Sequence, residues 1–166
     1  DMSAIAKGWG VDQIGMLLDS MGINNYLIEI GGEILVSGGN IKGSQNWEIG
    51  IRTPDNLNDS IYSIIKLSDQ AIATSGTYQN YFTLNGIEYS HLINPETGYP
   101  IKHEIVSATV IAPKCTDADA IATAVMVKGF DLGLDWINSL QSVEALLIIK
   151  NKNGNYSVGK SEGFNF

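Results

Sequence analysis

The organisation of this chain turns on the stretch Thr116-Asp117-Ala118-Asp119-Ala120-Ile121-Ala122-Thr123, where a strand pattern gives way to a helix pattern. Residues 106–112 are mostly apolar and rich in β-branched side chains, which predicts a strand, and residues 117–128 are predicted to form a helix that ends at Gly129. On that helix Asp119 and Thr123 share one face. A carboxylate and a hydroxyl on one face can bind the same hard cation, and Mg²⁺ prefers such oxygen ligands. The stretch therefore predicts a helix start and a candidate metal site.

The same residues also fit a purely structural role. Thr116 is a good N-cap, and Asp119 follows at the position where a capping box has Glu or Gln. A helical threonine such as Thr123 often bonds a backbone carbonyl one turn back. Taken alone, the pattern favours helix capping over metal binding, and both interpretations are open at this point.

Outside this stretch the chain alternates short strand patterns with further helix patterns. A helix is predicted over Ser3–Met21, ended by Gly22, and another over about Asp131–Leu140. The glycine-containing pairs Asn85-Gly86 and Asn153-Gly154 are typical of hairpin turns. The predicted strands are 26–30, 33–37, 47–52, 61–68, 71–73, 78–84, 87–92, 106–112, 143–149 and 156–158. Meandering strands with a few packed helices predict an α+β fold with mostly antiparallel sheets, in one domain.

Composition restricts the class of partner. The chain has 166 residues, 44% of them hydrophobic and 17% charged, which is enough for one domain with a buried core. The formal net charge of −8 argues against nucleic acid or an anionic membrane surface as the main partner. Arg52 is the only arginine, which disfavours a phosphate site built from arginines. A polyanionic ligand would need a metal or backbone amides to offset repulsion.

Two further observations concern covalent chemistry and the membrane. Cys115 is the only cysteine, so an intrachain disulfide is excluded, and we interpret it as a small structural residue. No apolar run approaches the roughly 20 residues of a membrane-spanning helix. The chain opens at Asp1 directly before a helix pattern, so we expect the true N-terminus to lie upstream.

Other candidate site residues lie far apart in the sequence. Thr74-Ser75-Gly76-Thr77 follows a strand pattern and offers donors for phosphate oxygens, or forms an ordinary polar turn. Lys7 opposes the dipole at a helix start, which suggests either a local use or an exposed solubilising role. His91 ends a strand next to a tight turn, where it suits general-base chemistry or a structural hydrogen bond. His103 is predicted to be a plain surface residue.

Five short motifs occur in the order that one known family has. They are residues 1–12 (DMSAIAKGWGVD), 30–34 (IGGEI), 73–76 (ATSG), 91–100 (HLINPETGYP) and 116–124 (TDADAIATA). Together they resemble the FAD:protein FMN transferases of the ApbE family, once called thiamine-biosynthesis lipoproteins. The resemblance implies an ApbE-like α+β fold related to the T-fold. It also implies that residues 1–166 are the C-terminal catalytic portion of a longer protein, whose N-terminal part is absent from this chain and supplies part of the FAD pocket.

The resemblance implies a Mg²⁺-dependent enzyme. Such an enzyme cleaves FAD at its diphosphate, releases AMP and joins FMN to a Thr or Ser hydroxyl of a target flavoprotein. Mg²⁺ would neutralise phosphate charge, which an acidic site with few arginines otherwise lacks the means to do. The resemblance also places the protein outside the cytoplasmic membrane, with membrane contact only through the absent N-terminal anchor.

The resemblance assigns roles to individual residues. Asp119 and Thr123 become metal ligands, helped by backbone carbonyls near Ala4 and Ala122. His91 and Asp119 become the catalytic residues, with His91 acting as a base or orienting the acceptor hydroxyl. The residues implied to contact FAD are Lys7, Glu33, Thr74, Ser75, Gly76, Tyr78 and His91. In a hairpin, an aromatic such as Tyr78 is also common in the core.

The chain departs from the family pattern at two positions, and alternative functions are open. Glu33 stands where Asp is frequent, and Asn94 stands where Asp is common, which puts a charge role at position 94 in doubt. One alternative is a Mg²⁺-dependent FAD pyrophosphatase, in which water replaces the acceptor hydroxyl. Another is a flavin-binding module without turnover. A plain α+β scaffold is disfavoured by the ordered set of motifs.

Overall fold

The computed structural model describes residues 2–40, 46–54, 60–77, 81–84, 87–102, 104–151 and 153–165. The helices in this part of the chain are η1 (Met2–Ala4, a 3-10 turn), α1 (Ala6–Ser20), α2 (Cys115–Lys128) and α3 (Phe130–Ser139). The strands are β1 (Tyr26–Ile30), β2 (Glu33–Ser37), β3 (Trp47–Arg52), β4 (Ile61–Leu67), β5 (Gln70–Gly76), β6 (Tyr81–Leu84), β7 (Ile87–Ser90), β8 (Ile105–Ala112), β9 (Glu144–Lys150) and β10 (Tyr156–Lys160).

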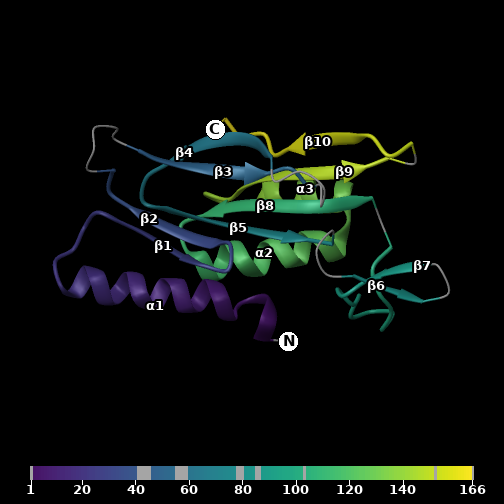
Figure 1. Ribbon diagram of the computed structural model, residues 1–166, viewed down its shortest axis with the longest axis horizontal. Coiled ribbons are helices and arrows are strands. Elements are labelled where there is room, and N and C mark those ends of the chain that lie inside the picture. The colour runs from purple at the N-terminus through teal and green to yellow at the C-terminus, as the bar shows by residue number, and fades with distance from the viewer. Residues whose placement is uncertain are drawn as a thin grey trace.

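Six of these strands form one antiparallel sheet in the order β1-β2-β5-β8-β9-β10 (Figure 1). Strand β5 lies inside the sheet, paired with β2 on one side and with β8 on the other. The hairpins β3–β4 and β6–β7 form two smaller antiparallel sheets. The predicted α+β fold with mostly antiparallel sheets is therefore confirmed.

The core has two sides because the central sheet is covered on both faces. On one face, small β8 residues such as Ala108 and Val110 pack against α2 and α3. On the other face, Ile111 of β8 packs with β3 and β4. Alternate residues of a strand point to opposite faces, so a strand that is covered twice is apolar along its whole length. This explains why β8 is buried along nearly its whole length and is mostly apolar, with Ser107 and Thr109 as its two polar residues.

The helices meet the sheet and one another through small residues. Gly8 of α1 lies so close to α2 that a Cβ atom there would lie 2.7 Å from the carbonyl carbon of Cys115. Gly15 allows a similar approach to the side chain of Leu35 on β2. Gly129, at φ 85°, ends α2 in a conformation that favours glycine. Small residues of α1 thus allow it to pack closely against α2 and β2.

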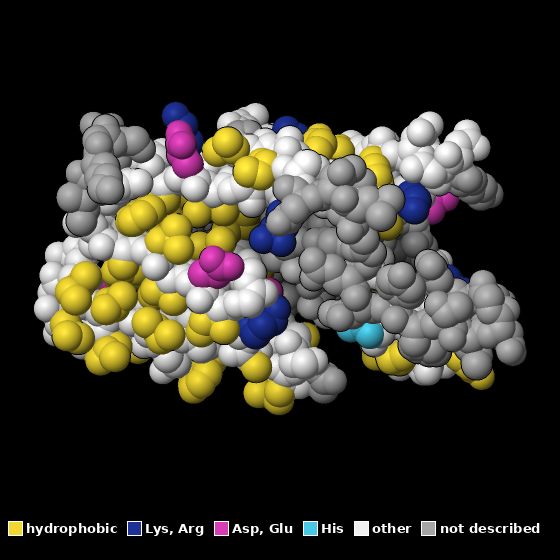
Figure 2. Space-filling model, viewed as in Figure 1, with side chains coloured by type: hydrophobic (Ala, Val, Ile, Leu, Met, Phe, Trp, Pro, Cys, Tyr) yellow, Lys and Arg dark blue, Asp and Glu magenta, His cyan; other side chains and the backbone are white. Residues whose placement is uncertain are grey.

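The outer face of α1 carries several exposed apolar side chains. Hydrophobic side chains gather on the surface over α1 in Figure 2, among them Trp9, Met16, Leu17 and Met21, which are more than half exposed. The stripe of α1 that packs inward is narrow, because within α1 only Gly8, Val11 and Gly15 are buried. Among the described residues, no helix is long and apolar enough to span a bilayer.

Two local predictions near the site are wrong. Helix α2 begins at Cys115 and its N-cap is Lys114, so Thr116 lies inside the helix and does not cap it. Strand β5 continues through Gly76, so Thr74-Ser75-Gly76 is part of a strand and not a loop. The smaller differences are the end of β7 at Ser90 and the break between η1 and α1 at Ile5. The predicted turn Asn85-Gly86, Tyr78 and His103 lie outside the described residues.

Candidate functional site

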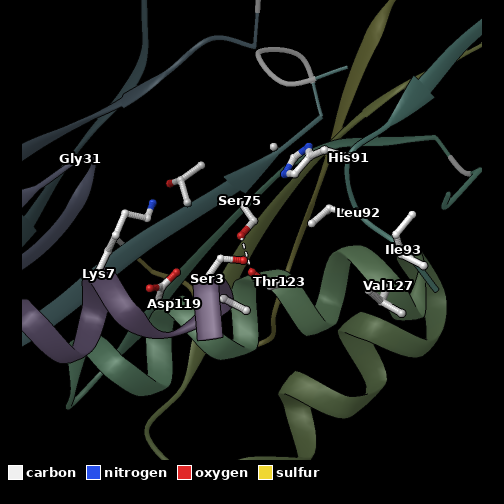
Figure 3. Close-up of a pocket in the computed structure, with 13 residues that line it drawn as sticks. Ser3, Lys7, Gly31, Ser75, His91, Leu92, Ile93, Asp119, Thr123 and Val127 are labelled. Atoms are coloured by element: carbon white, nitrogen blue, oxygen red, sulfur yellow. Dashed lines mark hydrogen bonds between the residues drawn. The ribbon is translucent and has the colours of Figure 1, made fainter. Parts of the chain in front are cut away.

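A cleft of about 540 Å³ opens on the helical side of the sheet, between the start of α1, strand β5, helix α2 and the segment after β7 (Figure 3). It gathers residues from all five sequence motifs. Its lining consists of Ser3, Ala4, Lys7, Gly31, Thr74, Ser75, Gly76, His91, Leu92, Ile93, Asp119, Thr123 and Val127. Most of the predicted site residues therefore meet in one place, although they lie far apart in the sequence.

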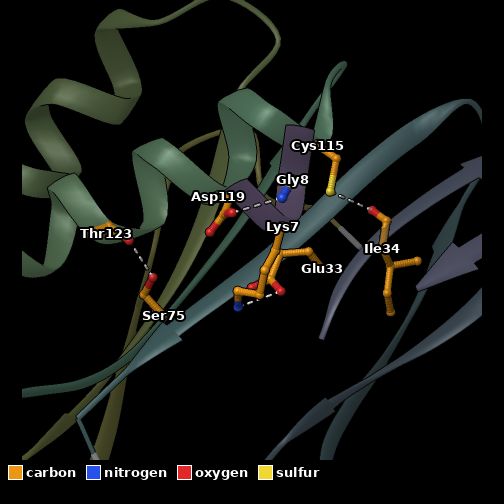
Figure 4. Close-up of polar contacts among 8 residues, drawn as sticks. All are labelled: Lys7, Gly8, Glu33, Ile34, Ser75, Cys115, Asp119 and Thr123. Atoms are coloured by element: carbon orange, nitrogen blue, oxygen red, sulfur yellow. Dashed lines mark hydrogen bonds and ion pairs between the residues drawn. The ribbon is translucent and has the colours of Figure 1, made fainter. Parts of the chain in front are cut away.

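Among the described residues that line the cleft, Asp119 is the only acidic one, and it is buried at 3% exposure. Its Oδ2 accepts a hydrogen bond from the backbone N–H of Gly8, with a distance of 2.9 Å. In Figure 4 the other carboxylate oxygen points away from Gly8. Burial raises the pKa of Asp119, while the Gly8 N–H and the charge of Lys7 oppose this rise. The carboxylate thus bonds a different helix, and the capping-box interpretation of Asp119 is wrong.

Thr123 lies one turn after Asp119 on α2 and faces strand β5. The hydroxyl oxygens of Thr123 and Ser75 are hydrogen-bonded at 3.0 Å. Figure 3 shows this pair and Asp119 on the same side of α2, below the cleft. Ser75 points toward the helix because alternate residues of β5 face opposite sides of the sheet.

The oxygen groups at the base of the cleft fit a hard cation. They comprise the carboxylate of Asp119 and the hydroxyls of Thr123 and Ser75, with the backbone of Ala4 also in the lining. No three His, Cys, Asp or Glu residues come together in the described part of the chain, so a metal here would have one carboxylate and neutral oxygens around it. Mg²⁺ is commonly bound through one or two carboxylates together with waters and substrate phosphates. Ala122, whose backbone carbonyl was also predicted to bind the metal, is fully buried and does not line the cleft.

Lys7 and Glu33 form an ion pair at the edge of the cleft. The Nζ of Lys7 lies 2.6 Å from Oε2 of Glu33, and the side chains are 44% and 2% exposed, respectively. Burial raises the pKa of Glu33, while its hydrogen bond to the Lys7 ammonium opposes the rise. Glu33 is not part of the cleft lining, in contrast to its predicted contact with FAD. It acts on the cleft through Lys7, whose ammonium it holds in place.

His91 follows strand β7 and is exposed at the rim of the cleft. Figure 3 shows its ring above Ser75, on the opposite side of the cleft from Lys7. The next residues form a closed turn, in which Asn94 Oδ1 accepts hydrogen bonds from the N–H groups of Glu96 and Thr97 at 2.8 and 3.3 Å. An amide oxygen serves this turn as well as a carboxylate would, which accounts for Asn94 in the position where the family commonly has Asp.

Cys115 has the structural role that its sequence context suggests. The thiol is buried and donates to the carbonyl oxygen of Ile34 at 3.6 Å. Burial, together with the negative charges of Asp12 and Glu33, raises the pKa of Cys115 to about 12. The thiolate is therefore disfavoured at neutral pH.

Several residues of the site were given no individual role from the sequence, although Gly31, Leu92 and Ile93 lie within the quoted motifs. Gly31 joins the cleft to a second hollow of about 300 Å³, which also contains Thr74 and Arg52. Leu92, Ile93 and Val127 form the apolar end of the cleft. These residues carry no chemical signature, and they become visible only once the chain is folded. Tyr78, which was predicted to contact FAD, lies outside the described residues.

Comparison with known proteins agrees with this geometry. Residues 1–147 match the ApbE family. A Vibrio cholerae protein named FAD:protein FMN transferase is 46% identical over 154 residues, which are 93% of this chain and 46% of that protein. A Haemophilus influenzae protein of the same name is 41% identical over 155 residues, or 93% of this chain and 44% of that protein.

Solved structures give the same result. The flavin transferase ApbE from Vibrio cholerae is similar with a TM-score of 0.85 at 42% identity, covering 99% of this chain and 51% of that one. The Pseudomonas stutzeri flavinyl transferase ApbE in its apo form has a TM-score of 0.84 at 33% identity, covering 99% and 50%. The chain thus spans about half the length of the relatives it matches. On the match over residues 1–147, the chain belongs to the ApbE family.

Proposed function

We propose that the full-length protein containing this chain transfers FMN from FAD to a Thr or Ser hydroxyl of a target flavoprotein, and that the transfer depends on Mg²⁺. The observation that carries this proposal is that all five family motifs meet in one cleft, and that the oxygen groups at the bottom of this cleft fit a hard cation. Relatives that share these motifs are named FAD:protein FMN transferase.

In the proposed reaction the acceptor oxygen bonds to the phosphorus of the FMN half of FAD. The bond from that phosphorus to the bridging oxygen breaks, and AMP leaves with the bridging oxygen. The hydroxyl proton passes to a base, for which His91 is our candidate because its ring lies at the rim above Ser75 (Figure 3). General-base catalysis of this kind typically contributes about 10²–10⁴-fold in rate.

Asp119 and Thr123 would hold Mg²⁺, with the Ala4 carbonyl as a further ligand. A bound Mg²⁺ supplies charge neutralisation at the diphosphate. Ser75 orients the Thr123 hydroxyl through their hydrogen bond. Lys7, held by Glu33, places a positive charge beside the base of the cleft. These groups offset phosphate charge in a chain whose net charge is −8. A carbonyl contribution from Ala122 and a ring contact from Tyr78 stay predictions.

FAD is an extended molecule, and the site offers room on two sides of Gly31. The main cleft and the smaller hollow share the lining residues Gly31 and Thr74, and we propose that an extended ligand reaches from one into the other. The target flavoprotein must then approach from the rim that carries His91, since the acceptor hydroxyl has to reach the reacting phosphorus. The extracytoplasmic, membrane-anchored location that the resemblance implies also stays a prediction.

The test uses the full-length protein with FAD, Mg²⁺ and a domain that carries the acceptor hydroxyl, followed by mass spectrometry of the acceptor. We expect a mass gain of one FMN group, with release of AMP, and loss of both in EDTA. Cleavage of FAD to FMN and AMP without a mass gain would indicate the pyrophosphatase instead. FAD binding without cleavage, unchanged by EDTA, would indicate a binding module.

A further inference from the structure

Helices α1 and α2 cap one another, and neither has a capping side chain at its own N-cap position. The N-cap residues are Ile5 for α1 and Lys114 for α2, and neither makes a side-chain cap hydrogen bond. The first N–H groups of a helix have no partner within the helix and need one from outside. In both helices a carboxylate from the other helix supplies it.

Asp12 of α1 caps α2. Its Oδ1 accepts the N–H of Cys115 at 2.9 Å, and its Oδ2 accepts the N–H of Thr116 at 2.9 Å and the Thr116 hydroxyl at 2.5 Å. The carboxylate thereby satisfies two free N–H groups and lies at the positive end of the helix dipole. Asp12 does not line the cleft, and the family resemblance gave it no role, although it lies within the first motif.

Asp119 of α2 completes the exchange in the other direction. Its Oδ2 accepts the N–H of Gly8, which is one of the free groups in the first turn of α1. Asp12 and Gly8 lie about one turn apart on α1, and so do Thr116 and Asp119 on α2. The hydrogen bonds of Asp12 and that of Asp119 therefore lie at neighbouring points of the contact between α1 and α2, where Gly8 allows the helices to approach closely.

This contact lies directly behind the base of the cleft. The start of α1 contributes Ala4 and Lys7 to the lining, and α2 contributes Asp119 and Thr123. A change in the separation of the two helices would move one set of ligands relative to the other. A carboxylate that fixes this separation affects cation binding without touching the cation.

We propose that Asp12 is a positioning residue for the cation site: by capping α2 from α1, it holds Asp119 against Gly8 and sets its second oxygen relative to Ala4 and Lys7. The inference rests on the proposed function for the role of the cation. Outer groups that orient metal ligands typically contribute about 10–100-fold to metal affinity. For Asp12 we expect the lower end of this range, because it acts through a helix and not through a direct bond to the ligand.

The experiment titrates full-length protein with Mn²⁺, used as a spectroscopic probe of the Mg²⁺ site, and follows free Mn²⁺ by electron paramagnetic resonance. The variants are Asp12→Ala, Asp12→Asn and the control Asp19→Ala. Asp19 is a carboxylate of the same helix that accepts a hydrogen bond from the Tyr26 hydroxyl at 3.1 Å, and it lies outside the cleft. The melting temperature of each variant is measured in parallel.

We expect Asp12→Ala to raise the dissociation constant for Mn²⁺ by about 10-fold. Asp12→Asn should have a smaller effect, since its amide oxygen still accepts a hydrogen bond, and it carries the test if the alanine variant does not fold. Asp19→Ala should bind Mn²⁺ like the wild type at whatever melting temperature it has. In the transfer assay, excess Mg²⁺ should restore Asp12→Asn, which a purely structural defect would not allow.

The possible results separate this inference from the function on which it rests. Wild-type Mn²⁺ affinity in folded Asp12→Ala would overturn the role of Asp12 alone. Equal loss of affinity in Asp12→Ala and Asp19→Ala would also overturn it, because the effect would then be general destabilisation. If the wild type binds no Mn²⁺ in the presence or absence of FAD, the metal assignment fails as well.

Discussion

The hydroxyl groups of Ser75 and Thr123 are hydrogen-bonded at 3.0 Å, and this bond joins strand β5 to helix α2 at the base of the cleft (Figure 4). The neighbouring Thr74 points to the opposite face of the sheet, where its hydroxyl lies 2.9 Å from that of Thr109. Two adjacent hydroxyls of one strand thus serve different purposes. Only Ser75 is in contact with a candidate metal ligand.

The first prediction separates the proposed metal ligand Thr123 from Ser75, the residue proposed to orient it. Thr123→Val keeps the shape of the side chain and removes the hydroxyl, so we expect transfer at low Mg²⁺ to fall by about 10-fold or more and to recover in part with excess Mg²⁺. Ser75→Ala should have the smaller effect on the Mg²⁺ requirement. Each variant should lose about 1 kcal/mol of unfolding free energy with the hydrogen bond. The measurement is the Mg²⁺ dependence of transfer, with Thr123→Ser as the variant that keeps the hydroxyl.

The second prediction concerns the pH dependence that Asp119 imposes. Burial raises its pKa in the folded protein above the ordinary 3.8, so the folded state binds the proton more readily than the unfolded state does. Its contribution to stability is therefore present at low pH and is lost as the pH rises through the folded pKa. Asp119→Asn has no carboxyl group to titrate, so in EDTA its stability relative to the wild type should increase as the pH rises above about 3.8.

The same variant should lose the response to metal. At neutral pH, Mg²⁺ should raise the melting temperature of the wild type but not that of Asp119→Asn. Transfer by Asp119→Asn should fall by more than roughly 100-fold, which is the upper end of the effect of groups that only orient a metal ligand. Asp117→Asn is the control, since Asp117 is an exposed carboxylate in the first turn of the same helix. Full transfer by Asp119→Asn would refute the metal assignment.

The third prediction tests the close contact between α1 and α2. A Cβ atom at Gly8 would lie 2.9 Å from Cβ of Asp119 and would meet the backbone of Cys115, which has no room to move. Gly8→Ala should therefore cost about 1–3 kcal/mol of unfolding free energy. Gly10→Ala is the matched control, because its Cβ would lie 3.4 Å from the flexible end of Ile30 and the substitution favours the helix by about 0.5–1 kcal/mol. The measurement is the free energy of unfolding of both variants in urea, and an equal value for the two would contradict the close contact at Gly8.

The site was predicted from the sequence better than its local structure was. The strands 26–30, 33–37 and 47–52 have the predicted bounds, because their apolar patterns and flanking turns are local signals. The Thr-Ser-Gly stretch looked like a loop since hydroxyl residues and glycine are common in turns, yet pairing of residues 74–76 with β8 keeps β5 extended through Gly76. Tertiary hydrogen bonding outweighed local preference there.

Helix α2 illustrates what a single sequence does not contain. Thr116 fits a local capping pattern, but the cap comes from Asp12, more than a hundred residues earlier. Similarly, Glu33 looked like a ligand contact, but its carboxylate is turned toward Lys7. Contacts between distant segments decide both cases. The ordered motifs identified the residues that meet in the cleft, but not which of them support the others from behind.

The fourth prediction concerns His91. If it takes the proton of the acceptor hydroxyl, His91→Gln should lower the rate of transfer by about 10²–10⁴-fold. The side chain is exposed at the rim, so the melting temperature should change far less than the rate of transfer does. Tyr99→Phe is the control, since Tyr99 is 73% exposed in the turn that follows His91. A wild-type rate of transfer by His91→Gln would exclude it as the base.

The fifth prediction uses the ion pair between Lys7 and Glu33. Lys7→Met leaves the buried carboxylate without its cation, which should cost about 1–3 kcal/mol of unfolding free energy. We expect the lower part of that range because Lys7 is 44% exposed and water partly replaces it. Adding Glu33→Gln should restore part of the loss, since the neutral amide needs no counter-charge, and a double-mutant cycle in urea measures the coupling.

The pH dependence of this variant follows from the raised pKa of Glu33. Lys7 opposes that rise, so its removal should raise the pKa further and enlarge the difference between the folded and unfolded states. The proton is then bound more tightly in the folded state, and stability is lost as the pH rises through the folded pKa. The defect of Lys7→Met should therefore be small below the ordinary value of 4.5 and grow above it. A defect that is equal at all pH values would mean that Lys7 contributes by packing rather than by charge.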